Sequence, residues 1–425
     1  MTQQYLKRII DGELDELLPQ LPAISLEGPK GVGKTETARR RAGTIHELDE
    51  PAQRTIVEAD PSRVLAGNPV ILIDEWQRVP AVWDVVRRAV DAGCPPAKFL
   101  LTGSASPSDA PTHSGAGRIV TVRMRPLSLA ERPLGHPVIS LGELLHGRRP
   151  ALAGTSEAGL KDYVDEIIQS GFPGLRGYSG RGLRAQLDGY LHRIIERDFA
   201  EQGLTVRRPE ALKRWLIAYA AATATPASFE AIRDAATSGE GDKPAKTTTQ
   251  PWHDALTRLW ILDPVPAWLP TQNDLSRLAQ APKHHLADPA FAARLLGLDA
   301  EALLAGGESG PRITRGGSLL GRLFESLVTL SVRVYAQANE AHVRHLRLHA
   351  GQREVDLIVE RPDRRVLAIE VKLSRTVGDS DVRQLLWLKE RIGDDLLDAI
   401  VIHTGPEAYR RKDGIGVIPA ALLGV

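Results

Sequence analysis

The chain of 425 residues is longer than one hydrophobic core normally supports, so we expect two or three domains. Hydrophobic residues make up 42% of it and charged residues 25%, a composition typical of a globular protein in water. The net charge of +1 excludes a general attraction to nucleic acid or to acidic membranes, so any such partner must be held by a local basic patch.

The sequence indicates neither a membrane protein nor a secreted one. No stretch approaches the roughly 18 apolar residues of a membrane helix. The opening stretch MTQQYLKRIIDGELDELLPQ mixes acids into its apolar positions, unlike a signal peptide. Cys94 has no second cysteine with which to form an internal disulfide. We therefore expect a cytoplasmic protein without a membrane partner.

Short apolar segments alternate with helical ones up to about residue 135. The segments AISLE, TIVEA, VILID and KFLLTG have the composition of buried strands, whereas KTETARRRAG and AVWDVVRRAVDA have helical periodicity. This alternation is typical of an α/β domain with a parallel sheet. We assign residues 1–150 to this domain.

The stretch GPKGVGKT fits the pattern G-x-x-x-x-G-K-[ST], directly between a predicted strand and a predicted helix. In this pattern backbone N–H groups surround the phosphates, the lysine reaches the β and γ phosphates, and the final hydroxyl binds Mg²⁺. The sequence therefore predicts ATP and Mg²⁺ as cofactors, bound by Gly28, Pro29, Lys30, Gly31, Val32, Gly33, Lys34 and Thr35.

Further candidate residues follow the later strands. Asp74 and Glu75 end VILIDE, at the strand end that faces the ligand crevice in a parallel sheet, so Asp74 is expected to bind Mg²⁺ and Glu75 to orient the attacking water. Thr102 and Ser104 in LTGSAS are candidates for contacts to the γ-phosphate or the water, or else ordinary strand residues. Arg118 is either an arginine that stabilises transition-state charge, from this subunit or a neighbour, or a surface arginine.

Residues 151–310 are expected to form a mostly helical middle region. Three successive helices and a β-like tail suit a winged helix, whose third helix could enter a DNA major groove. That helix offers only His253 and Arg258 as phosphate contacts, while Trp252, Leu256 and Trp260 are expected in the core. Packing or formation of a homo-oligomer is the favoured alternative to DNA contact.

Residues 311–425 are expected to form an α/β/α sandwich, with a helix in GSLLGRLFESLVTLSVRVYAQANE followed by strands and a second helix. The strands are predicted around 343–349, 353–360 and 365–373 and in LDAIVIHTG, and the second helix at 380–392. Three stretches rich in Ser, Gly and Pro are expected to be loops or linkers, at 104–117, 236–248 and 303–318.

Two neighbouring strands of this last domain carry ionisable side chains at alternate positions. Residues i and i+2 of a strand share a face, so Glu354 and Asp356 point one way, as Glu370 and Lys372 do on the next strand. A turn at RPDRR lets the strands pair as a hairpin, which brings the four groups together. Buried unpaired carboxylates are costly, so the cluster is expected to hold a cation.

The run from the phosphate loop through DEWQRVPAVWDVVRRAVD, LTGSAS and RPLSLAER resembles the bacterial and archaeal AAA-type ATPases that carry a C-terminal domain of unknown function. SGFPG, ERDF, HHLADPAFA, GRLFESLV, REVDLIVE and IEVKLS agree, so the resemblance covers nearly the whole chain. It implies an ATP-binding protein of undetermined biological role. Trp76 and a long insertion after Ser104 depart from the usual pattern without touching the phosphate ligands.

The order Asp, then Glu-x-Lys on the adjacent strand, is similar to the active site of the PD-(D/E)xK nuclease superfamily, whose fold is restriction-endonuclease-like. This resemblance implies that Asp356 and Glu370 bind one or two Mg²⁺ or Mn²⁺ ions and that Lys372 positions or activates a water. It also implies that Glu325, on the preceding helix, completes the metal site. Arg347 is a candidate phosphate contact.

Together these observations predict an α/β multidomain protein, a Mg²⁺-dependent ATPase that acts on DNA through a C-terminal domain which cleaves or binds it. A nuclease-like fold can keep its acids and still serve as a binding module. The alternative is therefore a regulatory ATPase switch with a catalytically silent C-terminal domain, used for partner binding or assembly.

Overall fold

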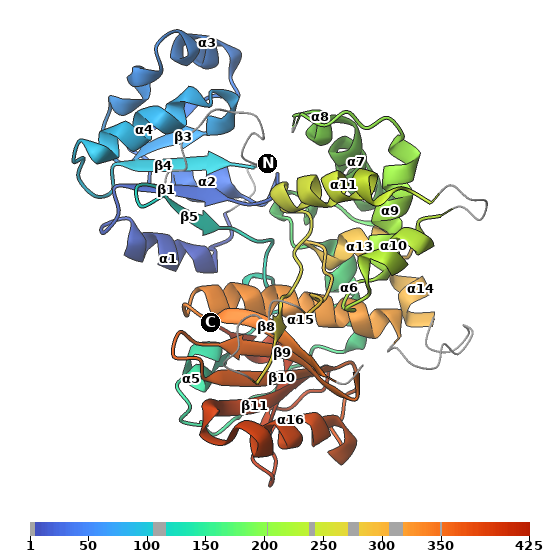
Figure 1. The fold of residues 1–425 in the computed structure, drawn as a ribbon. Helices are drawn as coiled ribbons and strands as arrows, with labels where there is room; N and C mark the ends of the chain where they lie inside the picture. Colours follow the sequence, from blue (N-terminus) through green and yellow to red (C-terminus); the bar gives the residue numbers. More distant parts are fainter. Residues whose placement is uncertain are drawn as a thin grey trace.

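The computed structural model describes residues 5–104, 116–201, 203–237, 243–270, 280–305, 318–348 and 351–425. It has an N-terminal α/β part, a helical middle region and a C-terminal sheet with helices on both faces, coloured blue, green to yellow, and orange to red in Figure 1. Most of the loop expected at 104–117 and most of the linker expected at 303–318 lie outside the described residues. Within the described part of the chain, no helix has the length and apolar character needed to cross a membrane.

The N-terminal sheet consists of five parallel strands in the order β2-β3-β4-β1-β5. Their bounds are β1 (Ala23–Glu27), β2 (Thr44–Glu47), β3 (Ile71–Asp74), β4 (Phe99–Gly103) and β5 (Val120–Arg123). The central strands are buried along nearly their whole length, which explains their continuous apolar sequences. The predicted parallel sheet is confirmed, and the carboxyl ends of β1, β3 and β4 meet at one edge.

One predicted strand of this domain is wrong. TIVEA is the second half of helix α3 (Pro51–Ala59), and the strand beside β3 is formed instead by the preceding TIHE segment. Pro51 begins the helix, a position where its missing N–H and fixed φ are favourable. Val57 is the only buried residue of α3, so this helix packs on the domain by one narrow face. The β-branched residues of TIVEA therefore belong to a largely exposed helix.

The middle region is helical, as expected. Its helices are α6 (Leu160–Gln169), α7 (Gly180–Arg193), α8 (Phe199–Glu201), α9 (Pro209–Ala221), α10 (Phe229–Ala235), α11 (Lys246–Arg258), α13 (Pro289–Leu295) and α14 (Ala300–Ala305). A π-helical turn at Ile194–Asp198 joins α7 to α8. After α11 the backbone of Val265 pairs antiparallel with Lys283, and residues 271–279 between them lie outside the described residues. The winged-helix comparison stays a prediction.

The C-terminal sheet has seven strands in the order β12-β13-β11-β10-β9-β8-β7. Leu367 and Ile369 of β10 join the core with α15 (Leu319–Gln337), whereas Val366 and Ala368 join the core with α16 (Asp379–Ile392). The two helices therefore cover opposite faces, as Figure 1 shows. The strands are β7 (Ala267–Trp268), β8 (His342–Leu348), β9 (Arg353–Glu360), β10 (Val366–Lys372), β11 (Leu396–His403), β12 (Tyr409–Arg410) and β13 (Gly416–Pro419). The predicted α/β/α order is observed.

Segments from earlier in the chain add to this C-terminal module. β7 belongs to the middle region and pairs with β8. β6 (Ile139–Ser140) pairs with β14 (Leu423–Gly424), and α5 (Leu141–Leu145) packs near β10 and β11 (Figure 1). Residues 139–145, which we assigned to the N-terminal domain, thus pack with the C-terminal module. The three parts therefore exchange segments and are not separate along the chain.

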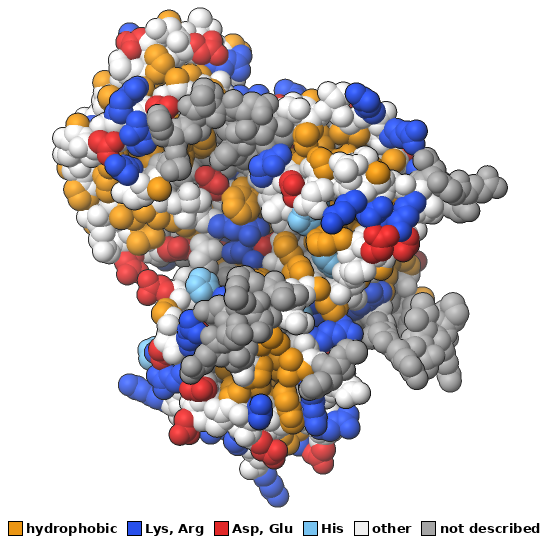
Figure 2. Space-filling model, in the orientation of Figure 1, with side chains coloured by type: hydrophobic (Ala, Val, Ile, Leu, Met, Phe, Trp, Pro, Cys, Tyr) orange, Lys and Arg blue, Asp and Glu red, His pale blue; other side chains and the backbone are white. Residues whose placement is uncertain are grey.

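A buried carboxylate joins all three parts. Asp263, between α11 and β7, accepts hydrogen bonds of 2.9 Å from Arg123 and Arg125 at the end of β5. Arg333 of α15 lies 2.9 Å from the same carboxylate. Burial alone would raise the pKa of Asp263, but the three guanidinium groups hold it far below its ordinary value. Figure 2 shows Lys and Arg side chains gathering at the centre of this face, where the three parts meet.

Replacing Asp263 by Asn should destabilise the chain by about 3–5 kcal/mol, because three buried guanidinium groups lose their counter-charge. We expect the thermal unfolding midpoint, followed by circular dichroism, to fall by several degrees. Asp254→Asn is the matched control on α11, where the carboxylate is half exposed, and should leave the midpoint nearly unchanged. Equal midpoints for the two variants would show that the Asp263 cluster does not hold the parts together.

Candidate nucleotide site and carboxylate cluster

The phosphate loop turns tightly between β1 and helix α2 (Lys34–Arg39). Gly28, Gly31 and Gly33 have positive φ angles of 157°, 77° and 108°. A Cβ atom on Gly28 would lie 2.2 Å from the carbonyl oxygen of Met124, which follows β5. The close approach of β5 therefore requires glycine at position 28.

Lys34 lies folded over this loop. Its Nζ donates hydrogen bonds to the carbonyl oxygens of Gly28 and Pro29, at 2.8 and 2.9 Å. The side chain is buried, and burial lowers the pKa of Lys34 to about 8 against the opposing charges of Glu75 and Asp74. A bound triphosphate can offer this ammonium better acceptors than the two carbonyls.

The predicted Mg²⁺ residues meet at the edge of the sheet. Thr35 Oγ1 donates to Asp74 Oδ1 at 2.9 Å, and the Thr102 hydroxyl donates to the same oxygen. Thr102 reaches Asp74 because β3 and β4 pair these two residues in register. A hydroxyl next to a carboxylate is a hard oxygen donor set that fits a Mg²⁺ ion shared with phosphates.

Glu75 stands next to this donor set in a strained conformation, with a φ of +53°. Burial raises its pKa above the ordinary value. Gln77 Nε2 donates to Glu75 Oε2 at 2.5 Å and to Ser104 Oγ at 3.3 Å, so it orients the carboxylate. The sequence analysis missed Gln77, although its place two residues after the acid pair in DEWQR was a usable signal.

Arg118 does not lie near the phosphate loop. It precedes β5, which runs parallel to β1, so it stands at the amino edge of the sheet, whereas the loop follows the carboxyl end of β1. Its Nε lies 2.7 Å from Asp91 at the end of α4 (Ala81–Asp91). In this arrangement Arg118 does not reach the phosphate loop of its own chain. A role toward a neighbouring subunit stays a prediction.

The phosphate loop also contacts the middle region. Lys30 Nζ lies 2.6 Å from Asp198 Oδ1 and 2.8 Å from Glu201 Oε2. The Tyr190 hydroxyl donates to the Lys30 carbonyl oxygen at 2.9 Å. These partners flank and include the π-helical turn between α7 and α8, so the loop predicted to bind the phosphates also contacts the middle region.

A buried arginine that the sequence analysis missed supports the loop from behind. Arg8 Nη1 donates to the carbonyl oxygen of Val32 at 3.0 Å, and its Nε pairs with Glu131 at 3.0 Å.

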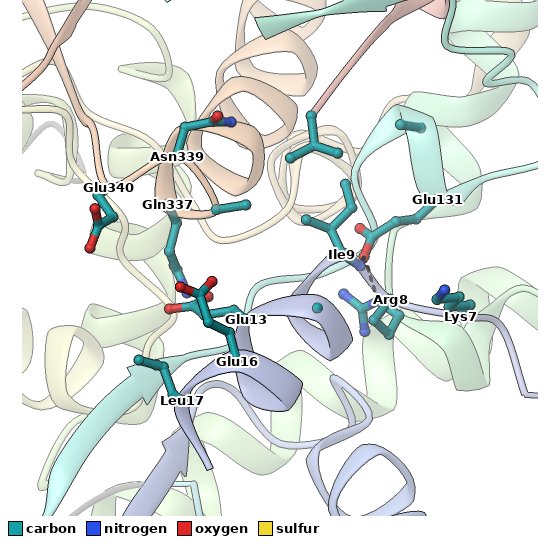
Figure 3. A pocket seen from close by; sticks show the side chains of 14 residues that line it. Lys7, Arg8, Ile9, Glu13, Glu16, Leu17, Glu131, Gln337, Asn339 and Glu340 are labelled. Carbon is teal, nitrogen blue, oxygen red and sulfur yellow. Dashed lines mark hydrogen bonds and ion pairs between the residues drawn. The ribbon is translucent and has the colours of Figure 1, made fainter. Parts of the chain in front are cut away.

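A cavity of about 740 Å³ lies beside this pair, between α1 (Ile9–Leu17) and the end of α15 (Figure 3). Gln337 donates to Glu13 across it at 2.9 Å. The cavity is lined by none of the residues predicted to bind ATP.

Two of the carboxylates predicted to bind a metal, Glu325 and Asp356, contact a lysine instead, together with Glu354. Lys283 Nζ lies 2.7 Å from Glu325, 3.1 Å from Asp356 and 3.3 Å from Glu354. Lys283 belongs to the middle region and is 1% exposed. Burial acts to lower the pKa of Lys283, but the carboxylates raise it well above its ordinary value, so the amine is charged.

The remaining predicted residues lie beside this contact. Asp356 Oδ2 accepts a hydrogen bond of 2.9 Å from the Val371 N–H, and Lys372 Nζ lies 2.9 Å from Glu370 Oε2. Burial and the nearby charge of Asp356 raise the pKa of Glu370 well above its ordinary value. The hairpin of β9 and β10 thus brings Asp356, Glu370 and Lys372 together.

This arrangement does not fit a divalent ion. Such an ion needs several oxygen ligands around it, and here the ammonium of Lys283 takes the central place. Among the residues that the structure describes, no three His, Cys, Asp or Glu side chains are placed to hold a metal together. The prediction of Mg²⁺ or Mn²⁺ on Glu325, Asp356 and Glu370 therefore does not hold for this arrangement.

Family models match three successive parts of the chain. They are an AAA domain at residues 20–132, a domain of unknown function (DUF8612) at residues 160–302 and another (DUF4143) at residues 320–423. The parallel sheet, the phosphate loop and the AAA match agree. The N-terminal part is an ATPase-like AAA domain. The C-terminal match names no activity, so it does not identify a nuclease.

Two mycobacterial proteins, both named as uncharacterised, are similar to nearly the whole chain. The proteins Mb2031c of Mycobacterium bovis and Rv2008c of Mycobacterium tuberculosis are each 26% identical, over 97% of this chain and 83% of theirs. The Walker-type ATPase paby2304 of Pyrococcus abyssi is 16% identical, and the alignment covers 68% of this chain and 96% of that one. Its TM-score of 0.40 does not establish a common fold for the whole chain.

Gly28→Ala should weaken ATP binding by about tenfold or more, since a strain of only about 1.4 kcal/mol has that effect. The added Cβ would push against the Met124 carbonyl and displace the loop. Titration with a fluorescent ATP analogue measures the change. Gly189→Ala in α7 is the control, because a Cβ there meets nothing within 4 Å. Unchanged affinity in Gly28→Ala would remove the loop geometry as the basis of binding.

Proposed function

We propose that the chain is a Mg²⁺-dependent ATP hydrolase that uses nucleotide binding and turnover to change how its middle region is held. This proposal rests on one observation: the phosphate loop lies beside Asp74 and Glu75 at the same edge of the sheet. Thr35 and Asp74 would hold Mg²⁺, which neutralises phosphate charge when bound. Lys34 binds the phosphates, and Glu75, oriented by Gln77, positions the attacking water and accepts its proton.

The contacts of Lys30 support the switching part of the proposal. Phosphate oxygens compete with Asp198 and Glu201 for the same ammonium, so nucleotide binding weakens the link to the π-helical turn. Such turns occur frequently at functional sites. Because the nucleotide then interacts differently with the two arrangements, it can shift the balance between them.

Lys34→Ala should abolish ATP hydrolysis, because the loop loses the cation that reaches the phosphates. Glu75→Gln should still bind ATP but turn it over about 10²-fold more slowly, the usual contribution of a general base. Phosphate release with and without EDTA measures both effects and the dependence on Mg²⁺. Lys213→Ala, an exposed position on α9, is the control. Full turnover by the Lys34 variant would contradict the assignment.

Action on DNA is a second candidate function. It is supported by Arg347 and Arg353, on β8 and β9 beside the carboxylate cluster. Arg347 is partly exposed and lies 3.9 Å from Glu354, and the guanidinium of Arg353 lies 5.0 Å from the ring centre of Trp387. Two such cations can contact a phosphate backbone. In the alternative, the C-terminal module is catalytically silent and binds a protein partner.

If DNA binds here, its affinity should fall steeply as salt rises, because phosphate contacts release counterions. The double change of Arg347 and Arg353 to Ala should weaken binding about tenfold at low salt and flatten the salt dependence. Fluorescence anisotropy with duplex, single-stranded and branched DNA provides the measurement. Arg391→Ala at an exposed position of α16 is the control. No binding of any substrate at low salt would favour the protein-partner alternative.

A further inference from the structure

The carboxylate cluster of the C-terminal module already holds a cation, and that cation comes from the same chain. Glu325 of α15 and Glu354 and Asp356 of β9 converge on Lys283 Nζ. The lysine is held in place by its backbone, since Lys283 and Val265 exchange two N–H···O bonds of 2.9 Å. We call the three carboxylates the Lys283 socket.

A second cation lies beside the socket, since Arg347 Nη1 is 3.9 Å from Glu354 Oε2. Glu325 Oε1 is the nearest of the three carboxylate contacts, at 2.7 Å from Lys283 Nζ. His345 lies beside the lysine and bonds to the Ala281 carbonyl at 3.1 Å. Burial and the Lys283 charge lower the pKa of His345 to about 4, which keeps the ring neutral.

An ammonium and a divalent ion cannot use these oxygens at the same time. Mg²⁺ binds carboxylate oxygens at about 2.0–2.1 Å, and it would lie where Nζ now lies. We propose that Lys283 closes the cluster to divalent ions and fastens the middle region to the C-terminal module, so that a metal can enter only after the Lys283 segment withdraws. This inference goes beyond the proposed ATPase and does not depend on nucleotide turnover.

The segment that carries Lys283 is tied to elements near the nucleotide site. The His284 N–H donates to the Thr225 carbonyl at 2.9 Å, which joins the segment to the turn that follows α9. Its pairing partner Val265 follows Asp263, whose carboxylate is held by arginines at the end of β5. A shift of the middle region relative to the ATPase domain would therefore move Lys283 within its socket.

Binding of Mn²⁺ to the full chain in the absence of nucleotide, followed by electron paramagnetic resonance, tests the proposal. Every protein in the series carries Thr35→Ala, which removes the phosphate-loop ligand. This parent should bind no Mn²⁺ at the cluster. Adding Lys283→Ala should create a Mn²⁺ site, and adding Asp356→Asn to that variant should remove it again. Lys161→Ala, an exposed lysine of α6, is the control and should bind no Mn²⁺.

A second variant covers the case in which Lys283→Ala does not fold, because that change leaves three carboxylates without a cation. Lys283→Met combined with Glu325→Gln removes the ammonium and the carboxyl group nearest to it, and keeps the volumes similar. It should fold, as judged by circular dichroism, and gain a weaker Mn²⁺ site. Hydrogen exchange of residues 280–286 should also be faster than in the parent, because their anchor is lost.

Two results would overturn the inference. Mn²⁺ bound by the parent and lost on Asp356→Asn would show that the cluster accepts a metal with Lys283 in place. Folded Lys283 variants that gain no Mn²⁺ would show that the lysine does not exclude one. Neither readout involves ATP hydrolysis, so failure of the proposed ATPase leaves this test unaffected.

Discussion

The position of the three parts relative to one another depends on the buried carboxylate of Asp263. Arg123 and Arg125 come from the end of β5, and Arg333 comes from α15, so one anion holds the ATPase domain and the C-terminal module together. The same end of β5 approaches the phosphate loop, because the Met124 carbonyl lies against Gly28. A buried charge that loses its partner costs several kcal/mol. Movements of the parts must therefore keep this cluster paired or supply it with other partners.

Two lysine contacts join the middle region to its neighbours. An anion can compete for one of them, and a cation can compete for the other. Lys30 of the phosphate loop pairs with Asp198 and Glu201 of the middle region, so an anion such as a triphosphate competes for it. Lys283 of the middle region pairs with carboxylates of the C-terminal module, so a cation competes with it. This arrangement makes the middle region the element whose position both sites can influence.

The sequence pattern was enough to predict the elements whose structure depends mainly on residues close together in the chain. The phosphate loop and β1, β3 and β4 could be predicted, since a continuous apolar run followed by a glycine-rich turn has few alternatives. TIVEA was assigned wrongly because a run of this length does not separate helix from strand, although Pro51 marked a helix start. The distance of Arg118 from the phosphate loop of its own chain could not be predicted, because spacing says nothing about which sheet edge a residue occupies. Lys283 and Asp263 were missed because their partners are far away in sequence; each is a charge within an otherwise apolar or histidine-rich segment.

For the C-terminal carboxylate cluster, the sequence could predict the need for a cation but not which cation meets it. Alternating acids on a hairpin predicted that Asp356 and Glu370 would converge, and the need for a cation followed from the cost of burying them. The identity of the cation did not follow, because a metal ion and an ammonium meet the same need. A lysine tethered by the fold acts at an effective concentration of about millimolar or more, and it cannot diffuse away. Under this proposal, a divalent ion reaches these oxygens only when the backbone pairing of Lys283 with Val265 shifts. Control of the site then lies with the position of Lys283 and the residues next to it, 280–286, rather than with the carboxylates themselves.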